Sequence, residues 1–360
     1  MIGTMSGTSA DGIDLAEIVT DGETVERFGP VETAPYGVGT REAVLEAVAR
    51  GPENRSAWSA IAEAVTRDHA TEVTRFITDN TLQPDFVVFH GQTVWHDPDR
   101  GETVQLGSSQ TLANLLSLPV IGDLRLADME AGGQGAPIVP AYHRALLHSI
   151  GLPDGHTSDD PMCFLNIGGV SNLTFLAGDT ILSFDIGPGN ALLDDWISAR
   201  TNASCDENGR WSASGTVDPD IVDQVLQNPF FRLPGPKSLD RNAFSLDAVN
   251  RLGTEDGAAT LAAITVESIV SSLALLPEKP ALWVVCGGGR KNPTLMNGLK
   301  QRLETHVVSS DVCGIDGDAV EAQAMAFLGA RTCANLPTTY PETTGARRPV
   351  AGGRIFLPGR

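Results

Sequence analysis

The sequence has few of the features that would assign it at once to a common class of protein. Its 360 residues include five cysteines, which are widely spaced and contain no C-x-x-C pair. This pattern argues against both a disulfide framework and a zinc site, so we expect reduced thiols. No uninterrupted apolar run approaches the roughly 18 residues of a membrane span, and no leader-like segment opens the chain. We therefore expect a cytoplasmic protein without a membrane partner.

Basic residues are also scarce. The chain has 25 Lys and Arg residues against 45 Asp and Glu residues, a formal net charge of −20. Such a balance argues against nucleic acid as a partner, because phosphate backbones are bound through basic surfaces. The acidic excess fits either a protein adapted to high salt or an ordinary acidic surface, and the second is the favoured interpretation. The hydrophobic content of 41% is enough to bury a large core, and the length predicts two lobes.

The opening segment, Gly3–Asp14, has the composition of a phosphate-binding loop. Its glycines permit tight turns that present backbone N–H groups to an anion, and its Ser and Thr hydroxyls add donors. Asp11 and Asp14 could hold a divalent cation against the phosphate. The segment lacks the lysine of a Walker loop. From these residues alone, a phosphate loop and an ordinary Gly/Ser-rich hairpin are equally acceptable.

Apolar periodicity predicts an α/β protein. Strands are predicted at Ile13–Thr20, Thr24–Glu32, Asp85–Phe89, Pro119–Gly122, Met162–Ile167, Asn172–Leu176, Ile181–Phe184 and Leu282–Cys286. Helices are predicted at Arg41–Arg50, Ser56–Thr78, Ser109–Ser117, Ile138–Ser149, Ala191–Arg200, Ala258–Leu276, Thr294–Glu304 and Ala319–Arg331. Because both halves begin with strands and continue with helices and further strands, we predict a duplicated α/β unit. The glycine-rich segment Ala131–Pro137 is the predicted hinge between the lobes.

Polar side chains follow two predicted strands in the first half. The segment His90–His96 comes directly after a short buried strand, where α/β sheets usually place ligand contacts. Substrate hydrogen bonding or a local structural role is favoured for its histidines, because nothing nearby completes a metal-ligand set. Asp123 and Arg125 follow the next strand, and this pair suits a polar ligand that carries a carboxylate.

The second half contains two further glycine-rich turns after strands. Asp185 precedes the segment Ile186–Asn190 and a helix, which together describe an anion site beside an acid-base residue. Asp185 could instead cap a turn, but together with the opening loop the functional interpretation is favoured. The three consecutive glycines Gly287–Gly289 would let a flat ligand lie against the backbone, which fits a nucleoside.

For two charged residues, the sequence leaves two possible roles open. Lys237 is one of four lysines, and it either meets a phosphate or a partner subunit or is simply solvated. Glu321 lies in the first turn of a predicted helix, where a carboxylate favours the helix dipole. Because Glu321 follows the acidic loop Gly314–Asp318, it is also a candidate cleft residue.

Taken together, these motifs closely resemble those of the anhydro-N-acetylmuramic acid kinase family, in the superfamily of sugar kinases, hexokinase, actin and Hsp70 ATPases. The matching stretches are MSGTSADGID (5–14), HGQTVWH (90–96), AGGQGAPIVPAYH (131–143), NIGGVSN (166–172), FDIGPGN (184–190), CGGGRKN (286–292), DAVEAQAMAF (318–327) and TGARRP (344–349). Each is weak evidence alone, whereas their order and spacing form a specific signature over nearly the whole chain.

The resemblance implies a fold, a reaction and a set of site residues. The fold is a duplicated actin-like ATPase (ribonuclease H-like) α/β fold with two lobes around a central cleft. We expect lobe I at residues 1–130 and 341–360 and lobe II at 131–340. The reaction is ATP-dependent: it opens the 1,6-anhydro bridge of 1,6-anhydro-N-acetylmuramic acid with water and phosphorylates O6, during cell-wall recycling. The resemblance also implies a homodimer.

The implied residues fall into four groups. ATP is expected at Gly7, Thr8, Ser9, Ala10, Asp11, Gly12, Ile13, Asp14, Gly187, Gly189, Asn190, Gly287, Gly288 and Gly289. Mg²⁺ is expected at Asp11 and Asp14. The sugar and its lactyl carboxylate are expected at Arg125, Gln134, His143 and Glu321. Asp185 is expected to be the catalytic base that deprotonates the attacking water, as in an inverting glycosidase.

Two departures from the family pattern leave alternatives open. The segment Gln105–Ser109 and the acidic, lysine-poor composition differ from typical members. The chain could therefore be a kinase of another anhydro-sugar such as levoglucosan, which lacks the acetamido and lactyl groups. It could also be an actin-like nucleotide-binding protein without catalysis. The presence of both Asp185 and the full opening loop counts against this last possibility.

Overall fold

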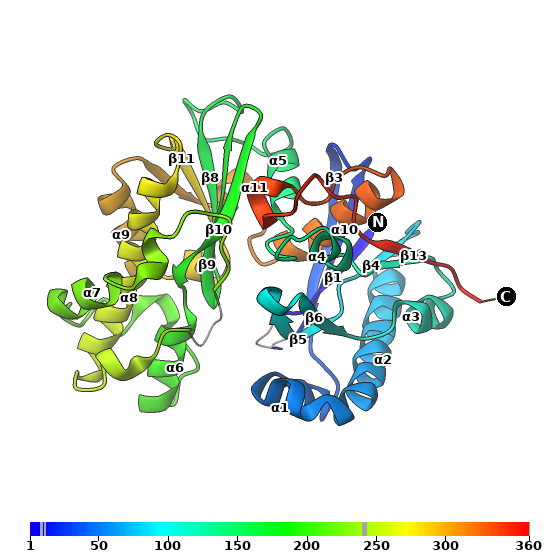
Figure 1. Ribbon diagram of the computed structural model, residues 1–360, viewed down its shortest axis with the longest axis horizontal. Helices are drawn as coiled ribbons and strands as arrows, with labels where there is room; N and C mark the ends of the chain where they lie inside the picture. The colour runs from blue at the N-terminus through cyan, green and yellow to red at the C-terminus, as the bar shows by residue number, and fades with distance from the viewer. Residues whose placement is uncertain (8–9, 11, 240–242, 360) are drawn as a thin grey trace. The chain divides into compact units, whose positions relative to one another are not determined.

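The structure is a computed structural model that describes residues 1–7, 10, 12–239 and 243–359. Its chain divides into two compact units, unit 1 with Met1–Ser149 and Ala319–Arg360 and unit 2 with Ile150–Asp318 (Figure 1). Three of the predicted site residues, Thr8, Ser9 and Asp11, lie outside the described residues.

Unit 1 is built on a six-stranded sheet with the order β13-β7-β4-β1-β2-β3. Its strands are β1 (Ile2–Met5), β2 (Ile13–Thr20), β3 (Val25–Ala34), β4 (Val87–Phe89), β7 (Val120–Gly122) and β13 (Arg354–Phe356), and a separate ribbon pairs β5 (Gln92–Asp97) with β6 (Glu102–Leu106). The first three strands pair antiparallel in chain order, β1 with β2 and β2 with β3. Strands β4 and β7 then continue the sheet parallel to β1.

Helices cover the sheet of unit 1 and close its core. They are α1 (Thr40–Arg50), α2 (Arg55–Asp79), α3 (Ser109–Leu116), α4 (Leu126–Glu130), α5 (Pro140–Leu146), α10 (Val320–Cys333) and α11 (Pro341–Thr344). Helix α10 packs on β1 so closely that a Cβ atom at Gly3 would lie 1.9 Å from the Ala322 carbonyl oxygen. Gly3 therefore serves helix-sheet packing within β1, and the opening loop itself begins only after Met5.

Unit 2 repeats the same topology on a five-stranded sheet of order β10-β9-β8-β11-β12. Its strands are β8 (Met162–Ile167), β9 (Val170–Ala177), β10 (Thr180–Pro188), β11 (Leu282–Cys286) and β12 (His306–Ser309), and its α-helices are α6 (Ala191–Arg200), α7 (Pro219–Leu226), α8 (Thr254–Ser271) and α9 (Pro293–Leu303). Three antiparallel strands are again followed by two that run parallel to the first. This is the order β3-β2-β1-β4-β7 of unit 1, so the predicted duplication is confirmed.

The division between the units differs from the predicted one. We predicted divisions after residues 130 and 340, whereas the chain divides after residues 149 and 318. The difference arises because α5 packs against α10, where the Tyr142 hydroxyl donates to Gln323 Oε1 at 2.8 Å. This contact holds the glycine-rich segment Ala131–Pro137 inside unit 1, and its role as a hinge stays a prediction.

Helix α8 supplies the centre of unit 2. Together with a following turn of 3₁₀-helix it forms Thr254–Leu275, the one segment of the described residues that is long and apolar enough to cross a membrane. Most of that window, 61%, is buried, and α8 packs against β10 and against α6, α7 and α9. The apolar side chains of this segment are therefore part of the core of unit 2.

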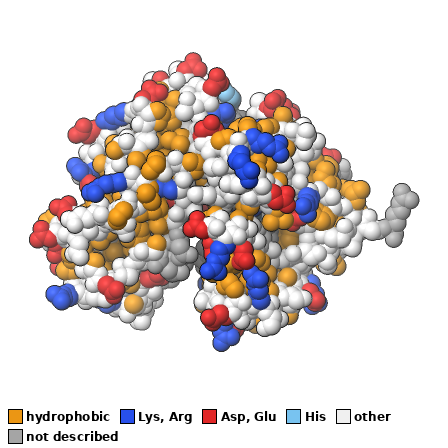
Figure 2. Space-filling view, in the orientation of Figure 1, with side chains coloured by type: hydrophobic (Ala, Val, Ile, Leu, Met, Phe, Trp, Pro, Cys, Tyr) orange, Lys and Arg blue, Asp and Glu red, His pale blue; other side chains and the backbone are white. Residues whose placement is uncertain are grey.

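The surface carries acidic and basic side chains side by side (Figure 2), within a net charge of −20. If the acidic excess is an adaptation to salt, counterions should stabilise the fold by screening this self-repulsion. We then expect the melting temperature to rise by several degrees between low and molar KCl in a thermal shift assay. A melting temperature that stays flat or falls would leave the ordinary acidic surface as the explanation.

Candidate active site

Three strands of unit 2 bring glycine-rich turns to one edge of the sheet. Strands β8, β10 and β11 run in the same direction, so the turns that follow them meet. A Cβ atom at Gly189 would lie 2.2 Å from the Gly168 carbonyl oxygen. One at Gly287, where φ is 74°, would lie 2.3 Å from Asn166 Oδ1. Only glycine fits both positions, so the predicted nucleotide turns of unit 2 are packed against each other.

The turn before α6 is less open to an anion than its sequence indicates. The backbone N–H groups of Gly189 and Asn190 donate to the carbonyl oxygens of Gly169 and Gly168, at 3.1 and 2.7 Å. The Asn190 side chain donates to the Ile167 carbonyl at 3.1 Å. These donors are already paired inside the protein. The exposed glycines at this edge are instead Gly169 and Gly288, in the turns after β8 and β11.

Asp185 lies at a bulge in β10, where the register against β9 shifts between Asp185 and Gly187. A bulge turns a side chain out of the regular alternation of a strand. The carboxylate accepts a hydrogen bond from the Leu239 backbone N–H at 2.7 Å. Burial raises the pKa of Asp185 to about 7, although this hydrogen bond and the charge of Lys237 act against the shift. A carboxylate that titrates near neutral pH is suited to take up a proton in catalysis.

Lys237 is a buried cation beside Asp185 and is not the solvated lysine that the sequence allowed. Its side chain is 6% exposed, donates from Nζ to the Phe230 carbonyl at 2.8 Å and lies over the Phe230 ring. Burial lowers the pKa of Lys237 to about 8. Its carbonyl oxygen also accepts the Asp185 backbone N–H at 2.9 Å, so Lys237 fixes the position of Asp185.

Arg290 holds the glycine turn after β11, and sequence reasoning did not single it out. The guanidinium donates to the Gly287 carbonyl at 3.1 Å and forms ion pairs with Asp318 at 2.8 Å and Asp311 at 3.1 Å. Hydrogen bonds from Arg290 contribute most to lowering the pKa of Asp318 to about 2. The only sign of this network in the sequence is the abundance of aspartate in residues 311–318.

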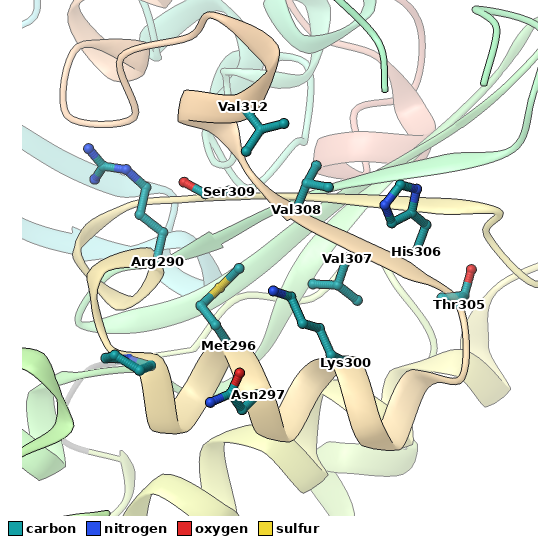
Figure 3. Close-up of a pocket in the computed structure, with 11 residues that line it drawn as sticks. Arg290, Met296, Asn297, Lys300, Thr305, His306, Val307, Val308, Ser309 and Val312 are labelled. Carbon is teal, nitrogen blue, oxygen red and sulfur yellow. The ribbon is translucent and has the colours of Figure 1, made fainter. Parts of the chain in front are cut away.

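A pocket of about 630 Å³ lies in unit 2 between α9 and the edge strand β12 (Figure 3). Met296, Asn297 and Lys300 line it from the helix, and Val307 and Val308 line it from the strand. None of the predicted site residues lines this pocket. Arg290, which also lines the pocket, connects it to the Gly287–Gly289 turn through its hydrogen bond to the Gly287 carbonyl.

In unit 1, the opening loop is anchored by residues outside it. Gln92 is fully buried, and its Oε1 atom accepts from the Ser6 hydroxyl at 2.6 Å and the Tyr36 hydroxyl at 2.8 Å. Its Nε2 atom donates to the Gly7 carbonyl at 3.0 Å. Arg41 donates to the carbonyl of Ala10 at 3.1 Å. These contacts fix Ser6, Gly7 and Ala10 to other parts of unit 1, and the use of the loop for phosphate stays a prediction.

The predicted loop residues at its C-terminal end belong to strand β2. Ile13 is fully buried, so its side chain is part of the core, and only its backbone could face a ligand. Gly12 would clash with the Ala34 carbonyl at 2.8 Å if it carried a Cβ atom. Asp14 accepts a hydrogen bond from the Thr33 hydroxyl at 2.6 Å.

Arg125 and Glu321 are partly buried charged residues of unit 1 that interact electrostatically. Arg125 donates from Nε to His90 Nε2 at 2.9 Å and from a terminal nitrogen to the Gly135 carbonyl at 2.6 Å. Burial lowers the pKa of Arg125 to about 10, so it stays charged near neutral pH. Burial, and then the negative charge of Asp14, raise the pKa of Glu321, while Arg125 lowers it. The predicted residues Arg125, Glu321 and Asp14 are thus electrostatically coupled.

The other two predicted sugar residues also lie in unit 1, where His143 is buried and Gln134 is partly buried. Gln134 lies in the glycine-rich segment, and its Oε1 atom has no hydrogen-bond partner among the described residues. Its backbone N–H donates to the Thr344 carbonyl at 2.7 Å. His143 lies on α5, and burial lowers its pKa to about 3, so it is neutral. An unpaired buried amide oxygen is costly and points to a missing polar partner.

Asp128 ties this region together and carried no signal in the sequence. Its side chain is 1% exposed and accepts from the Gly135 backbone N–H at 2.7 Å and from the Thr344 hydroxyl at 2.7 Å. The Thr339 hydroxyl also donates to it. The segment that carries Gln134 is thereby fixed to the chain around α11.

Two copies of one sheet topology, with glycine turns after strands and acidic residues near them, define a protein of the actin-like ATPase superfamily to which sugar kinases belong. A family model described as anhydro-N-acetylmuramic acid kinase matches residues 1–358. The chain belongs to the anhydro-N-acetylmuramic acid kinase family.

Curated relatives named anhydro-N-acetylmuramic acid kinase match this chain over nearly their whole length. The chain is 47% identical to the anhydro-N-acetylmuramic acid kinase of Azorhizobium caulinodans and 44% identical to that of Bradyrhizobium diazoefficiens, with 99% of each chain covered. It is 45% identical to that of Rhodospirillum rubrum, covering 99% of this chain and 93% of the relative. Among solved structures it is similar to a PilM-PilN type IV pilus biogenesis complex, with 13% identity, a TM-score of 0.47 and coverage of 91% and 98% of the two chains.

Proposed function

We propose that the protein is an ATP-dependent kinase of 1,6-anhydro-N-acetylmuramic acid. It opens the 1,6-anhydro bridge with water, phosphorylates O6 and releases N-acetylmuramic acid 6-phosphate and ADP. The single observation that carries the proposal is Asp185, a carboxylate with a pKa near 7 at a bulge beside the nucleotide turns. Membership of the family, with relatives 44–47% identical, supports the same activity.

Asp185 is the general base of this reaction. It takes a proton from a water molecule whose oxygen attacks the anomeric carbon C1, and the bond between C1 and O6 breaks. Asp185 can do this because burial raises its pKa to about 7, so that the carboxylate is a better base than one in water. Lys237 keeps the carboxylate available by holding its backbone and by favouring its charged form.

The departing O6 needs no separate acid. In an inverting glycosidase a second carboxylic acid protonates the leaving oxygen. Here the γ-phosphoryl group of ATP takes the place of that proton, because O6 becomes the acceptor oxygen. From the family resemblance, the opening loop is assigned to the phosphates of ATP and the Gly287–Gly289 turn to its nucleoside.

Mg²⁺ is the metal that such a phosphoryl transfer requires, and it neutralises charge on the phosphates when bound. Mg²⁺ is usually held by one or two carboxylates together with phosphate oxygens and water. No cluster of three or more ligating side chains occurs within residues 1–7, 10, 12–239 and 243–359. The carboxylate of Asp14, one of the two predicted ligands, fits this requirement and would hold the ion on the side of unit 1; the other predicted ligand, Asp11, lies outside the described residues.

The sugar is assigned to Arg125 and Gln134. The partly buried guanidinium of Arg125 can pair with the lactyl carboxylate, which levoglucosan lacks. The Oε1 atom of Gln134, which has no partner among the described residues, can accept a hydrogen bond from an N–H or O–H group of the sugar. A partly buried cation and this acceptor together favour a carboxylated amino sugar over a plain anhydro-hexose.

The test follows the oxygen of water. In ¹⁸O-labelled water, each ATP consumed is expected to give one reducing sugar 6-phosphate, with label at C1 and none in the phosphate when the product is analysed before exchange. The measurement is mass spectrometry of the product beside a coupled ADP assay. Label in phosphate would mean ATP hydrolysis without transfer, and efficient phosphorylation of glucose would mean an ordinary hexokinase.

Levoglucosan run in the same assay decides between the two family substrates. We expect kcat/KM for anhydro-N-acetylmuramic acid to exceed that for levoglucosan by roughly 100-fold or more, because levoglucosan would leave the partly buried Arg125 without its anion. Equal values would reassign the protein to plain anhydro-sugars.

A further inference from the structure

One short segment of unit 1 contacts both halves of the candidate site. His90, Gly91 and Gln92 connect β4 to β5, and the side chains of His90 and Gln92 are 5% and 0% exposed. Gly91 has φ of 75°, and a Cβ atom there would lie 2.8 Å from the Leu106 carbonyl. The chain can make this turn only with glycine, and the turn aims two successive polar side chains at different targets.

His90 is held in one tautomer and orients Arg125. Its Nδ1 atom lies 2.9 Å from the Gly91 carbonyl, which can only accept, so Nδ1 carries the hydrogen. Nε2 is then an acceptor and receives the Nε–H group of Arg125 at 2.9 Å. The Gly135 carbonyl takes a second N–H group of the guanidinium at 2.6 Å. Two fixed acceptors therefore set the plane of the guanidinium, and its remaining N–H groups are left to pair with an anion.

Gln92 fixes the position of the opening loop through hydrogen bonds, as His90 does for the Arg125 guanidinium. Its amide accepts from Ser6 and Tyr36 and donates to the carbonyl of Gly7, so it contacts two consecutive residues of the loop. Each of these contacts spans more than 50 positions in the sequence. The position of Gly7 relative to β5 is thus set by one buried amide.

We propose that His90-Gly91-Gln92 is a positioning element that holds the sugar-binding arginine and the phosphate loop in a fixed relation, His90 acting through Arg125 and Gln92 through Ser6 and Gly7. The proposal rests on the proposed function, because it assigns sugar to Arg125 and phosphate to the loop. Neither residue touches the reacting atoms. The two side chains should therefore affect different substrates.

A matched pair of variants tests His90. In His90→Gln the amide can place an oxygen near Nε2 and still accept from Arg125, whereas in His90→Asn the shorter side chain reaches only the place of Nδ1. We expect His90→Asn to raise KM for the anhydro-sugar roughly 10- to 100-fold, the worth of a lost charge-assisted hydrogen bond. KM for ATP should stay within about twofold, and His90→Gln should restore most of the sugar KM.

The route through Arg125 is tested by a double-mutant cycle with Arg125→Lys, which keeps the charge but removes the Nε–H donor. His90→Asn in that background should cause no further rise in sugar KM. Additive effects, or equal loss in His90→Gln and His90→Asn, would overturn the role assigned to His90.

Gln92→Glu tests the role of Gln92 in holding the opening loop, because one carboxylate oxygen would face the Gly7 carbonyl and repel it. We expect KM for ATP to rise roughly 10-fold or more while KM for the sugar is nearly unchanged. Gln224→Glu on α7, where the side chain is exposed, is the matched control and should leave both KM values unchanged. If Gln92→Glu does not fold, Tyr36→Phe removes one donor to the same amide and should raise only the ATP value. A rise in both KM values, or in neither, would overturn the role assigned to Gln92.

The outcomes separate this proposal from the proposed function. Wild-type protein that binds ATP but turns over no anhydro-sugar would contradict the proposed function. Wild-type turnover combined with variants that lower only kcat, without the split between the two KM values, would contradict the positioning element alone.

Discussion

Asp185→Asn is expected to lower kcat by roughly 10²- to 10⁴-fold, the usual contribution of a general base, while the affinity for ATP stays unchanged. Asparagine keeps the shape of the side chain and can still accept the Leu239 backbone N–H, which now lies 2.7 Å from Asp185 Oδ2. It cannot take up a proton. The measurement is steady-state turnover with anhydro-N-acetylmuramic acid beside a nucleotide-binding titration.

The pH profile gives this prediction a second readout. Because burial raises the pKa of Asp185 to about 7, the carboxylate is protonated and inactive at lower pH. Wild-type kcat/KM should therefore fall about tenfold per pH unit below pH ~6, and the residual activity of Asp185→Asn should lack this limb. Asp223→Asn, an exposed carboxylate on α7, is the control and should keep the wild-type profile.

The same shift has a consequence for stability. A carboxyl group whose pKa is higher in the folded state than in the unfolded state stabilises the fold only while it is protonated. The wild type should lose stability relative to Asp185→Asn as pH rises from about 4 to about 7. The Asp185→Asn variant is thus expected to melt at the same temperature as wild type near pH 4 and higher than wild type at pH 8.

The catalytic role of Asp185 would be contradicted by a folded Asp185→Asn variant that keeps more than about a tenth of the wild-type turnover.

Much of the fold could be predicted from the local pattern of apolar and polar residues. Long elements with clear periodicity were predicted within a few residues, such as α2, predicted as Ser56–Thr78 and found as Arg55–Asp79. The strands β1, β5, β6, β12 and β13 were not predicted, whereas the equally short β4 and β7 were, because their fully apolar runs mark them as buried strands. Helix α7 was missed because it lies between loop-like segments that resemble surface loops in composition.

The site residues also divide into those that the local sequence predicts and those that it does not. Asp185 and the glycine turns could be predicted because a strand, a carboxylate and glycines stand together in the sequence. The residues that support them could not. Asp128 acts through the hydroxyls of Thr339 and Thr344, more than 200 positions away, and a helix of five residues gives no sign of such a contact. Buried hydrogen bonds between distant segments depend on the tertiary fold and leave no local period.

Glycine substitutions at the strand ends of unit 2 are expected to weaken nucleotide binding in an order set by the space around each Cβ atom. Gly287→Ala should raise the Kd for ATP roughly 30- to 1,000-fold, because it combines overpacking with a left-handed backbone that alanine tolerates poorly. At this position φ is 74° and the new atom would lie 2.3 Å from Asn166 Oδ1.

The remaining members of the series give the control. Gly189→Ala meets the Gly168 carbonyl at 2.2 Å and should weaken binding roughly 10-fold or more, since backbone on both sides must shift. Gly288→Ala meets only the Asn190 side chain, at 3.3 Å, and should cost a few-fold at most. Gly253→Ala at the start of α8 has no atom within 4 Å and should bind ATP as wild type does. Titration of each folded variant with ATP gives the four Kd values. If Gly287→Ala and Gly189→Ala bind ATP as tightly as Gly253→Ala, the nucleotide does not lie against these turns, and its assignment to this edge of unit 2 is wrong.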